Sequence, residues 1–215
     1  MKTLTKRGRP RKFDEEQTLD LIMQVFWQHG YSATSLDQIA EATGLNRPSL
    51  YAAFGTKKDM FLKSIERFAD RMEAHLRDAG SRATGVNARM KDIMAAAVDL
   101  YTGKSDLTGA AHGCLAISTL PSEALQDSDF QLALGNVLLR MDTGFARLIL
   151  RESKGAVREA HAKEIAQHLA LVLHGLSIRA RAGENPEKLK RLSSSAVDRL
   201  ISAQASAFSD DDHHP

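Results

Sequence analysis

The chain has 215 residues, of which 43% are hydrophobic and 26% charged, and its formal net charge is +2 at pH 7. These values are ordinary for a soluble globular protein with one substantial core or two small packed units. No apolar run approaches the roughly 20 residues that span a bilayer. The single cysteine excludes an internal disulfide, so the sequence predicts a protein of the reducing cytoplasm.

The first twelve residues form a basic arm. It holds six basic residues and no acid, namely Lys2, Lys6, Arg7, Arg9, Arg11 and Lys12, and no apolar signal-peptide core follows it. Residues 1–58 carry nine Lys and Arg against six Asp and Glu. The arm could contact a polyanion, or it could be a disordered tail that makes the protein soluble. Charge alone does not decide between these two functions.

Apolar residues recur with helical spacing along almost the whole chain. The stripes begin with Leu19, Ile22, Met23, Phe26 and Trp27, which Gly30 ends, and continue with Phe61 to Leu76 on a helix running to about Ala79. Further stripes mark long helices at about 130–149, 157–182 and 186–207. No sustained period-two alternation is present, so the sequence predicts an all-α fold.

The segment from Gly30 to Phe61 carries the strongest local signals. Ser35 to Gln38 fits a capping box at the start of a short helix. Gly44 suits a left-handed turn, Asn46 can cap a second helix, and Pro48 falls in its first turn, where the missing N–H costs nothing. Two short helices joined by a glycine turn are typical of a helix-turn-helix, whose second helix lies in the major groove of DNA.

The outer surface of the second helix provides the candidates for reading DNA. Arg47 is the best candidate to bind a guanine edge, and Tyr51 can contact phosphate or a thymine methyl. Thr34 and Lys57 lie at helix starts, where hydroxyl, ammonium and backbone amides suit phosphate. Taken singly, such surface residues are more often just solvated.

The same stretch resembles the N-terminal domain of the tetracycline-repressor (TetR/AcrR-like) family. The resemblance rests on Thr34-Ser35-Leu36, Ile39-Ala40, Gly44-Leu45, Leu50-Tyr51 with Phe54, and Lys57-Lys58-Asp59-Met60-Phe61. It implies that the DNA contacts fall on Thr34, Ser35, Arg47, Pro48, Ser49, Tyr51 and Lys57. The chain departs from many members in having Ala52-Ala53 after the tyrosine, which leaves base reading mainly to Arg47 and Ser49. Gly8 to Arg11 resembles arms laid in a narrow minor groove.

The resemblance implies a small DNA-reading domain followed by a larger helical domain that binds an effector and dimerises. We therefore expect a basic arm at 1–12, a helix-turn-helix domain at 13–58, an effector-binding and dimerisation domain at 59–208 and a disordered tail at 209–215. The last two long helices have wide apolar faces that predict a four-helix bundle between two copies. The expected interface residues are Leu169, Leu173, Leu176, Leu192 and Leu200. Burial of these faces within one chain is the alternative.

The middle helices, at about 86–150, are expected to enclose the effector pocket. They are rich in methionine and aliphatic residues, including Met90, Met94, Leu100, Tyr101 and Met141, which could line a pocket for an apolar or irregular ligand. Membership of a plain core is the simpler interpretation of each residue.

Cys114 lies where a glycine-rich loop turns into a helix, two residues after His112. A helix N-terminus and an imidazolium both lower a thiol pKa, so the pair is a candidate redox sensor. A glycine-cysteine pair at this point resembles a pattern in thiol-sensing members of the family. A buried, inert cysteine is the commoner case.

The sequence contains none of the common catalytic or metal-binding motifs. His161 and His168 could share a helix face, but no further ligand completes a metal site at the usual spacing. No phosphate loop or nucleophile elbow supports an enzyme, and the basic arm and turn signature argue against a protein-interaction module. We therefore predict a homodimeric repressor without cofactor, bound to a palindromic double-stranded operator and released by an unknown small molecule or by thiol modification.

Overall fold

A computed structural model describes residues 13–207 of the chain, with side-chain environments up to residue 201. This part of the chain contains nine α-helices and no β-strand, apart from one isolated bridge between Ser105 and Thr108. The predicted all-α fold is confirmed. The expected basic arm at 1–12 and tail from 209 lie outside the described residues.

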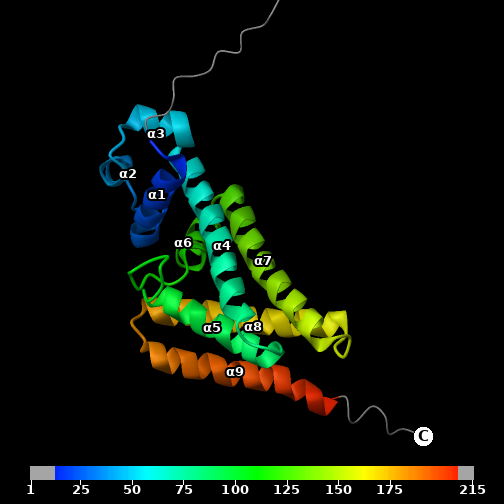
Figure 1. Cartoon of the computed structure of the whole chain (residues 1–215). Helices are drawn as coiled ribbons and strands as arrows, with labels where there is room; N and C mark the ends of the chain where they lie inside the picture. Colours follow the sequence, from blue (N-terminus) through cyan, green and yellow to red (C-terminus); the bar gives the residue numbers. More distant parts are fainter. Residues whose placement is uncertain (1–12, 208–215) are drawn as a thin grey trace, which may run out of the picture.

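The first three helices form a small head (Figure 1). They are α1 (Glu15–His29), α2 (Leu36–Thr43) and α3 (Arg47–Phe54). Asp14 starts α1 because its carboxylate accepts hydrogen bonds from the backbone amides of Glu16 and Gln17 at 2.9 and 3.1 Å. Gly30 ends α1 with a positive φ of 78°, the glycine stop that the sequence indicates.

Helix α4 (Lys57–Ser81) connects the head to the rest of the molecule (Figure 1). At 25 residues it is roughly 38 Å long. A capping box between Thr56 and Asp59 starts it. The helix passes without a break through the expected domain boundary at residues 58 and 59, so its two ends are mechanically continuous.

Side chains from α4 hold the head in place. Arg67 donates to the carboxylate of Asp20 on α1 at 2.5 and 3.0 Å and also pairs with Glu16. Lys58 forms ion pairs of 2.8 and 2.6 Å with Asp127 and Asp129, which lie at the start of α7. These contacts bridge residues far apart in sequence: those of Arg67 fix α1 of the head on α4, and those of Lys58 fix the start of α4 on α7.

The body contains the remaining helices: α5 (Val86–Tyr101), α6 (Leu115–Glu123), α7 (Ser128–Ser153), α8 (Glu159–Arg181) and α9 (Pro186–Ala207). Helix α7 runs beside α4, whereas α5, α8 and α9 lie across the far end of the molecule (Figure 1). The core runs continuously from Ile22 and Phe26 in the head to Leu173 in α8 and Val197 in α9. Among the described helices, none is both long enough and apolar enough to cross a membrane.

Candidate nucleic-acid interface

Local capping fixes where α2 begins. The Ser35 hydroxyl accepts a hydrogen bond from the Gln38 backbone amide at 3.2 Å, and the Gln38 side chain accepts one from the Ser35 amide at 2.7 Å. The predicted capping box is therefore confirmed. It gives the Ser35 side chain a structural role at the helix start, where any backbone or hydroxyl contact to a phosphate would also lie.

The turn between α2 and α3 sets the direction of α3. Gly44 has φ 67° and ψ 12°, a left-handed conformation that favours glycine. Asn46 then caps α3, with its side-chain oxygen accepting from the Ser49 amide at 2.9 Å, and Pro48 occupies the first turn. All three predictions for this turn are confirmed.

The inner faces of α2 and α3 anchor them on the head. Ile39 and Leu50 are completely buried and Phe54 is 3% exposed, in the same cluster as Ile22 and Phe26 of α1. Burial of such side chains contributes about 1.5–3 kcal/mol each. The outer face of α3 is thereby held outward, and it contains Arg47, Pro48, Tyr51 and Ala52, all exposed, with Ser49 half-buried.

Arg47 lies at the edge of this outer face and is held by Asp37 of α2. Its Nε and Nη2 donate to the Asp37 carboxylate at 3.0, 2.7 and 2.7 Å. These hydrogen bonds raise the pKa of Arg47, so the guanidinium stays charged. The role of Asp37 is not apparent from the sequence, although an acid in the first turn of the preceding helix is a place to look for such a partner.

Thr34 and Lys57, the two expected phosphate anchors, are less accessible than the sequence suggests. Thr34 is 2% exposed and its hydroxyl donates to the Gly30 carbonyl at 2.5 Å. The Lys57 ammonium lies 4.6 Å from the centre of the Tyr31 ring, and burial lowers the pKa of this lysine. Tyr31 is therefore an additional residue at this edge that sequence reasoning missed.

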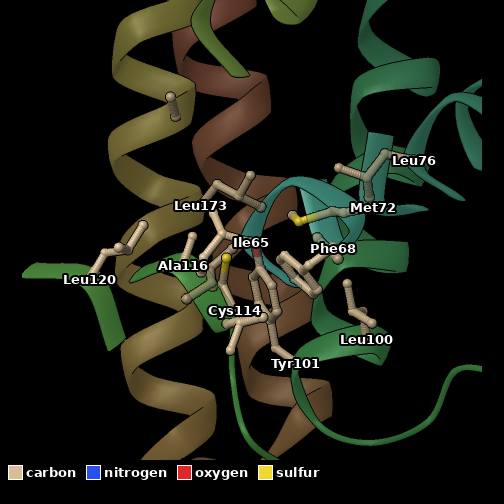
Figure 2. Packing of buried hydrophobic residues seen from close by; sticks show 14 of the residues in the cluster. Ile65, Phe68, Met72, Leu76, Leu100, Tyr101, Cys114, Ala116, Leu120 and Leu173 are labelled. Atoms are coloured by element: carbon tan, nitrogen blue, oxygen red, sulfur yellow. The ribbon is translucent and has the colours of Figure 1, made fainter. Parts of the chain in front are cut away.

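The structure corrects the environment expected for Cys114. Its side chain is 3% exposed and lies among Ile65, Phe68, Tyr101 and Leu173 (Figure 2). Burial raises the pKa of the thiol to about 11. Burial, followed by the charge of Arg181, lowers the pKa of His112, so this residue does not supply the expected imidazolium. The prediction of an activated thiolate is wrong because desolvation outweighs the helix N-terminus.

A cavity of about 680 Å³ opens between α4, α5 and α7. Of the residues expected to line an effector pocket, only Met141 lies on its wall. Met90, Met94, Leu100 and Tyr101 are at most 1% exposed in the core. Four of the five named residues therefore belong to the core, as the simpler interpretation held, because helical spacing does not distinguish a core face from a pocket wall.

The structure buries three of the five leucines expected at a dimer interface. Leu169, Leu173 and Leu176 are at most 3% exposed and pack inside the protomer, as the alternative interpretation held. Leu200 is half-buried against the same core, and Leu192 is 46% exposed. Of the five expected interface residues, Leu192 is therefore the one that stays well exposed for contact with a second copy.

The fold and the α2–α3 unit define an all-helical DNA-binding regulator with a helix-turn-helix head. Residues 19–63 match the family model described as bacterial regulatory proteins, tetR family. The chain is 30% identical over 194 residues to the HTH-type transcriptional repressor ComR of Escherichia coli K12, covering 89% of this chain and 90% of the relative. It is 26% identical to the repressor BdcR of the same strain, covering 85% and 86%.

Solved structures agree with this assignment. One is the TetR family transcriptional regulator CifR, a cysteine-substituted form complexed with 26-bp double-stranded operator DNA. It superimposes with a TM-score of 0.74 and 28% identity, covering 88% of this chain and 98% of that one. The chain belongs to the TetR family of bacterial regulatory proteins. It is a transcription regulator and not an enzyme, as the sequence predicts.

Proposed function

We propose that the protein is a homodimeric repressor that binds a palindromic operator through α3 and leaves it when a small molecule occupies the cavity between α4, α5 and α7. The observation that carries this proposal is the outward face of α3, where Arg47 and Tyr51 are exposed one turn apart on a rigid head and Ser49 is half-buried beside them. The names of ComR and BdcR support repression over activation. We divide the chain into a reading head at 13–58 and an effector and dimerisation body at 59–208.

Arg47 reads sequence in this proposal, and the helix starts position the head. Its guanidinium can exchange Asp37 for the two acceptors of a guanine edge, whose fork geometry resembles that of a carboxylate. Ser49 and Tyr51 add hydroxyl contacts. Ser35 and Lys57 lie at the starts of α2 and α4, where free backbone amides suit phosphate. The Thr34 hydroxyl already donates to the Gly30 carbonyl, so Thr34 can contact phosphate only through its backbone.

The proposed release uses the continuity between the cavity and the head. Phe68 lines the cavity and also packs edge-on against Trp27 of α1, with ring centres 4.8 Å apart. Nearer the head, Phe61 of α4 contacts Phe26 of α1 at 5.0 Å. A ligand that displaces α4 therefore acts on α1 through packed side chains, and typical coupling of about 1–3 kcal/mol is enough to shift operator affinity.

Two copies are required for a palindromic site, and α7 and α8 each offer a face for the second copy. Leu132 and Leu139 on α7 are 64% and 63% exposed, and Leu171 and Ile178 on α8 are 67% and 62% exposed. Each pair spans two helical turns and forms one stripe. The proposed interface replaces the buried leucines predicted from sequence.

Glycines within these stripes support their use as an interface. Gly135 lies between the two α7 leucines and Gly175 between Leu171 and Ile178. A Cβ at either glycine would meet nothing within 4 Å in the protomer. Since glycine inside a helix costs roughly 0.5–1 kcal/mol relative to alanine, close approach of a partner helix explains both.

A gel shift on the DNA upstream of the protein's own gene, at two salt concentrations, tests the proposed function. We expect specific binding that weakens steeply with salt, because phosphate contacts release counterions. Arg47→Ala should cost about 1–3 kcal/mol at the cognate site and much less on other DNA. Lys57→Ala should weaken binding to all sequences equally.

Lys163→Ala is the matched control, since Lys163 is exposed on α8 and pairs only with Glu159 within the described chain. It should leave both kinds of binding unchanged. No specific shift on any neighbouring promoter, or an Arg47→Ala effect equal on all DNA, would contradict the reading role assigned to α3.

A further inference from the structure

The cavity between α4, α5 and α7 has the size of a small-molecule site. Its volume of about 680 Å³ falls within the roughly 300–1,000 Å³ of ligand pockets. Apolar side chains from all three helices form much of its wall: Phe68, Met72, Leu76, Ile93, Val137, Met141, Phe145 and Leu148. This wall fits the apolar body of a ligand.

The charged part of the wall is strongly biased toward one sign. Five arginines line the cavity against two glutamates: Arg77, Arg89, Arg140, Arg147 and Arg151 against Glu73 and Glu152. A purely apolar ligand gives no reason for so many guanidinium groups at one opening. The excess of positive charge favours a ligand that is an anion.

Two of these arginines have donors that the protein does not use. Arg147 is exposed to solvent and forms no ion pair or hydrogen bond with any residue that the structure describes. The Arg89 Nε lies 3.4 Å from the Glu152 carboxylate, yet it is buried and makes no hydrogen bond. A buried donor without an acceptor is unfavourable, so an acidic group in the cavity would satisfy it.

The other three arginines of the wall are paired with carboxylates, as Arg89 is with Glu152. Arg140 binds Asp70 and Glu73 at 2.7 and 2.8 Å, and Arg77 lies 3.3 Å from Glu73. Arg151 lies 3.2 Å from Glu152. Arg147 is therefore the one arginine of the wall without a carboxylate partner among the described residues, and the Arg89 Nε is a buried donor without a hydrogen bond. These two groups are available to hold an incoming acid.

A glycine on the cavity wall also indicates that the cavity binds a ligand. Gly144 lies inside α7 between Arg140 and Arg147 and lines the cavity. A Cβ there would meet no atom within 4 Å, so packing within the protomer does not require glycine. Since glycine destabilises a helix interior relative to alanine, its presence is explained by space kept open for a ligand.

We propose that this cavity binds an amphipathic anion, with Arg147 and Arg89 holding its acidic head and the apolar wall holding its body. The inference deepens the proposed function, on which it rests for the consequence of binding. An acidic head could be a carboxylate or a phosphate, since arginine forms bidentate hydrogen bonds with both.

Fluorescence of Trp27, the single tryptophan, provides the measurement. Phe68 lies on the cavity wall 4.8 Å from its ring, so occupation of the cavity should change its emission. The full-length protein is titrated with dodecanoate, dodecyl phosphate and the neutral dodecanol, all below their aggregation limits. We expect at least one anion to bind about tenfold or more tightly than dodecanol, a ratio that corresponds to 1.4 kcal/mol.

Three variants locate the site. Arg147→Ala should bring the anion's affinity to within about threefold of dodecanol, whereas Arg191→Ala, an exposed arginine on α9 away from the cavity, should change nothing. Gly144→Leu should weaken all three ligands by filling the cavity. The more tightly bound anion identifies the head as carboxylate or phosphate.

Equal affinities for anion and alcohol, no saturable signal with any ligand, or the same loss in Arg147→Ala and Arg191→Ala would overturn the inference. Operator binding of the same preparations without ligand is measured in parallel. Intact operator binding with no preference for anions rejects the ligand class alone, whereas loss of specific operator binding in the unmodified protein rejects the proposed function.

Discussion

In the free protein, Arg47 is held by the carboxylate of Asp37, which it would exchange for a guanine edge in the proposed complex with DNA. Its fork-shaped contact with Asp37 orients the guanidinium beside α3, but both side chains are more than half exposed, so water and salt weaken the pair. Exchange of Asp37 for a guanine edge therefore costs little and replaces one bidentate contact with another. In this interpretation Asp37 orients the reading residue between encounters with DNA.

Cys114 has a directly measurable reactivity. Because burial raises its pKa to about 11, only about one thiol in a thousand is ionised at pH 8. We expect iodoacetamide to leave the native protein essentially unlabelled at this pH and to label it readily in urea. Mass spectrometry of the intact protein measures the difference.

A matched variant shows whether burial is the cause. Thr119→Cys places a thiol one turn further along α6, at another buried position, and Ser122→Cys places one at an exposed position on the same helix. Both substitutions are made separately in the Cys114→Ser protein, so that each variant contains a single thiol and its labelling reports on that thiol alone. Rapid labelling of native Cys114 but not of a cysteine at 119 would restore the idea of an activated thiol.

At the scale of elements, the joint between α1 and α4 rests on Asp20. Hydrogen bonds from Arg67, which is 20% exposed, lower the pKa of the Asp20 carboxyl, itself 31% exposed. Arg71 adds a contact of 2.6 Å. Since the folded-state pKa lies below the unfolded value of about 3.9, this carboxylate stabilises the fold above that pH, and the contribution disappears as the pH falls through the folded-state pKa.

Asp20→Asn should therefore lower the free energy of unfolding by about 1.5–2 kcal/mol at pH 7, the lower part of the range for hydrogen bonds to charged groups. The difference from the unmodified protein should shrink as the pH falls below about 3.9 and vanish once the pH is below the folded-state pKa of Asp20. Urea unfolding at several pH values measures it. Asp78→Asn is the control, because the pair of Asp78 with Arg82 is largely exposed, and it should cost less than about 0.5 kcal/mol. A pH-independent cost would contradict the role of the Asp20 charge.

The same scale shows what the sequence could and could not predict. Helix starts and stops depend on neighbouring residues, so Ser35, Gly44 and Asn46 were assigned correctly from local chemistry. The spacing of apolar residues also predicts that a helix face is buried, but it does not predict whether that face packs against the core, a ligand or a second copy. Leu173 and Met94 were therefore placed on an interface and a pocket wall, whereas both belong to the core. Contacts such as that of Arg67 with Asp20 have no local signature.

At the scale of the whole molecule, the single core couples the cavity to the head. Phe68 takes part in both the cavity wall and the packing on Trp27, and the indole of Trp27 donates to the Gly113 carbonyl at 3.1 Å. Helix α1 is therefore tied both to α4 and to the loop before α6. A shift of α4 alone would strain this second attachment, so the proposed release of the operator would require the head to move relative to the loop as well.

Dimerisation through α7 and α8 gives the last prediction. Leu171→Glu puts a charge within the α8 stripe and should raise the dimer dissociation constant by at least about tenfold, since burying an unpaired charge costs well over 1.4 kcal/mol. Leu125→Glu makes the same change at a leucine that is 86% exposed outside both stripes, and it should have no effect. Size-exclusion chromatography with light scattering measures the association.

Gly175→Leu separates the interface from the protomer's own stability. Nothing in the protomer lies within 4 Å of the added Cβ, and leucine is a better helix former than glycine, so the protomer should be at least as stable as before. The partner helix can no longer approach closely, so the dimer and its affinity for a palindromic operator should both weaken. A dimer that survives both Leu171→Glu and Gly175→Leu would instead place the interface on α9, where Leu192 is exposed.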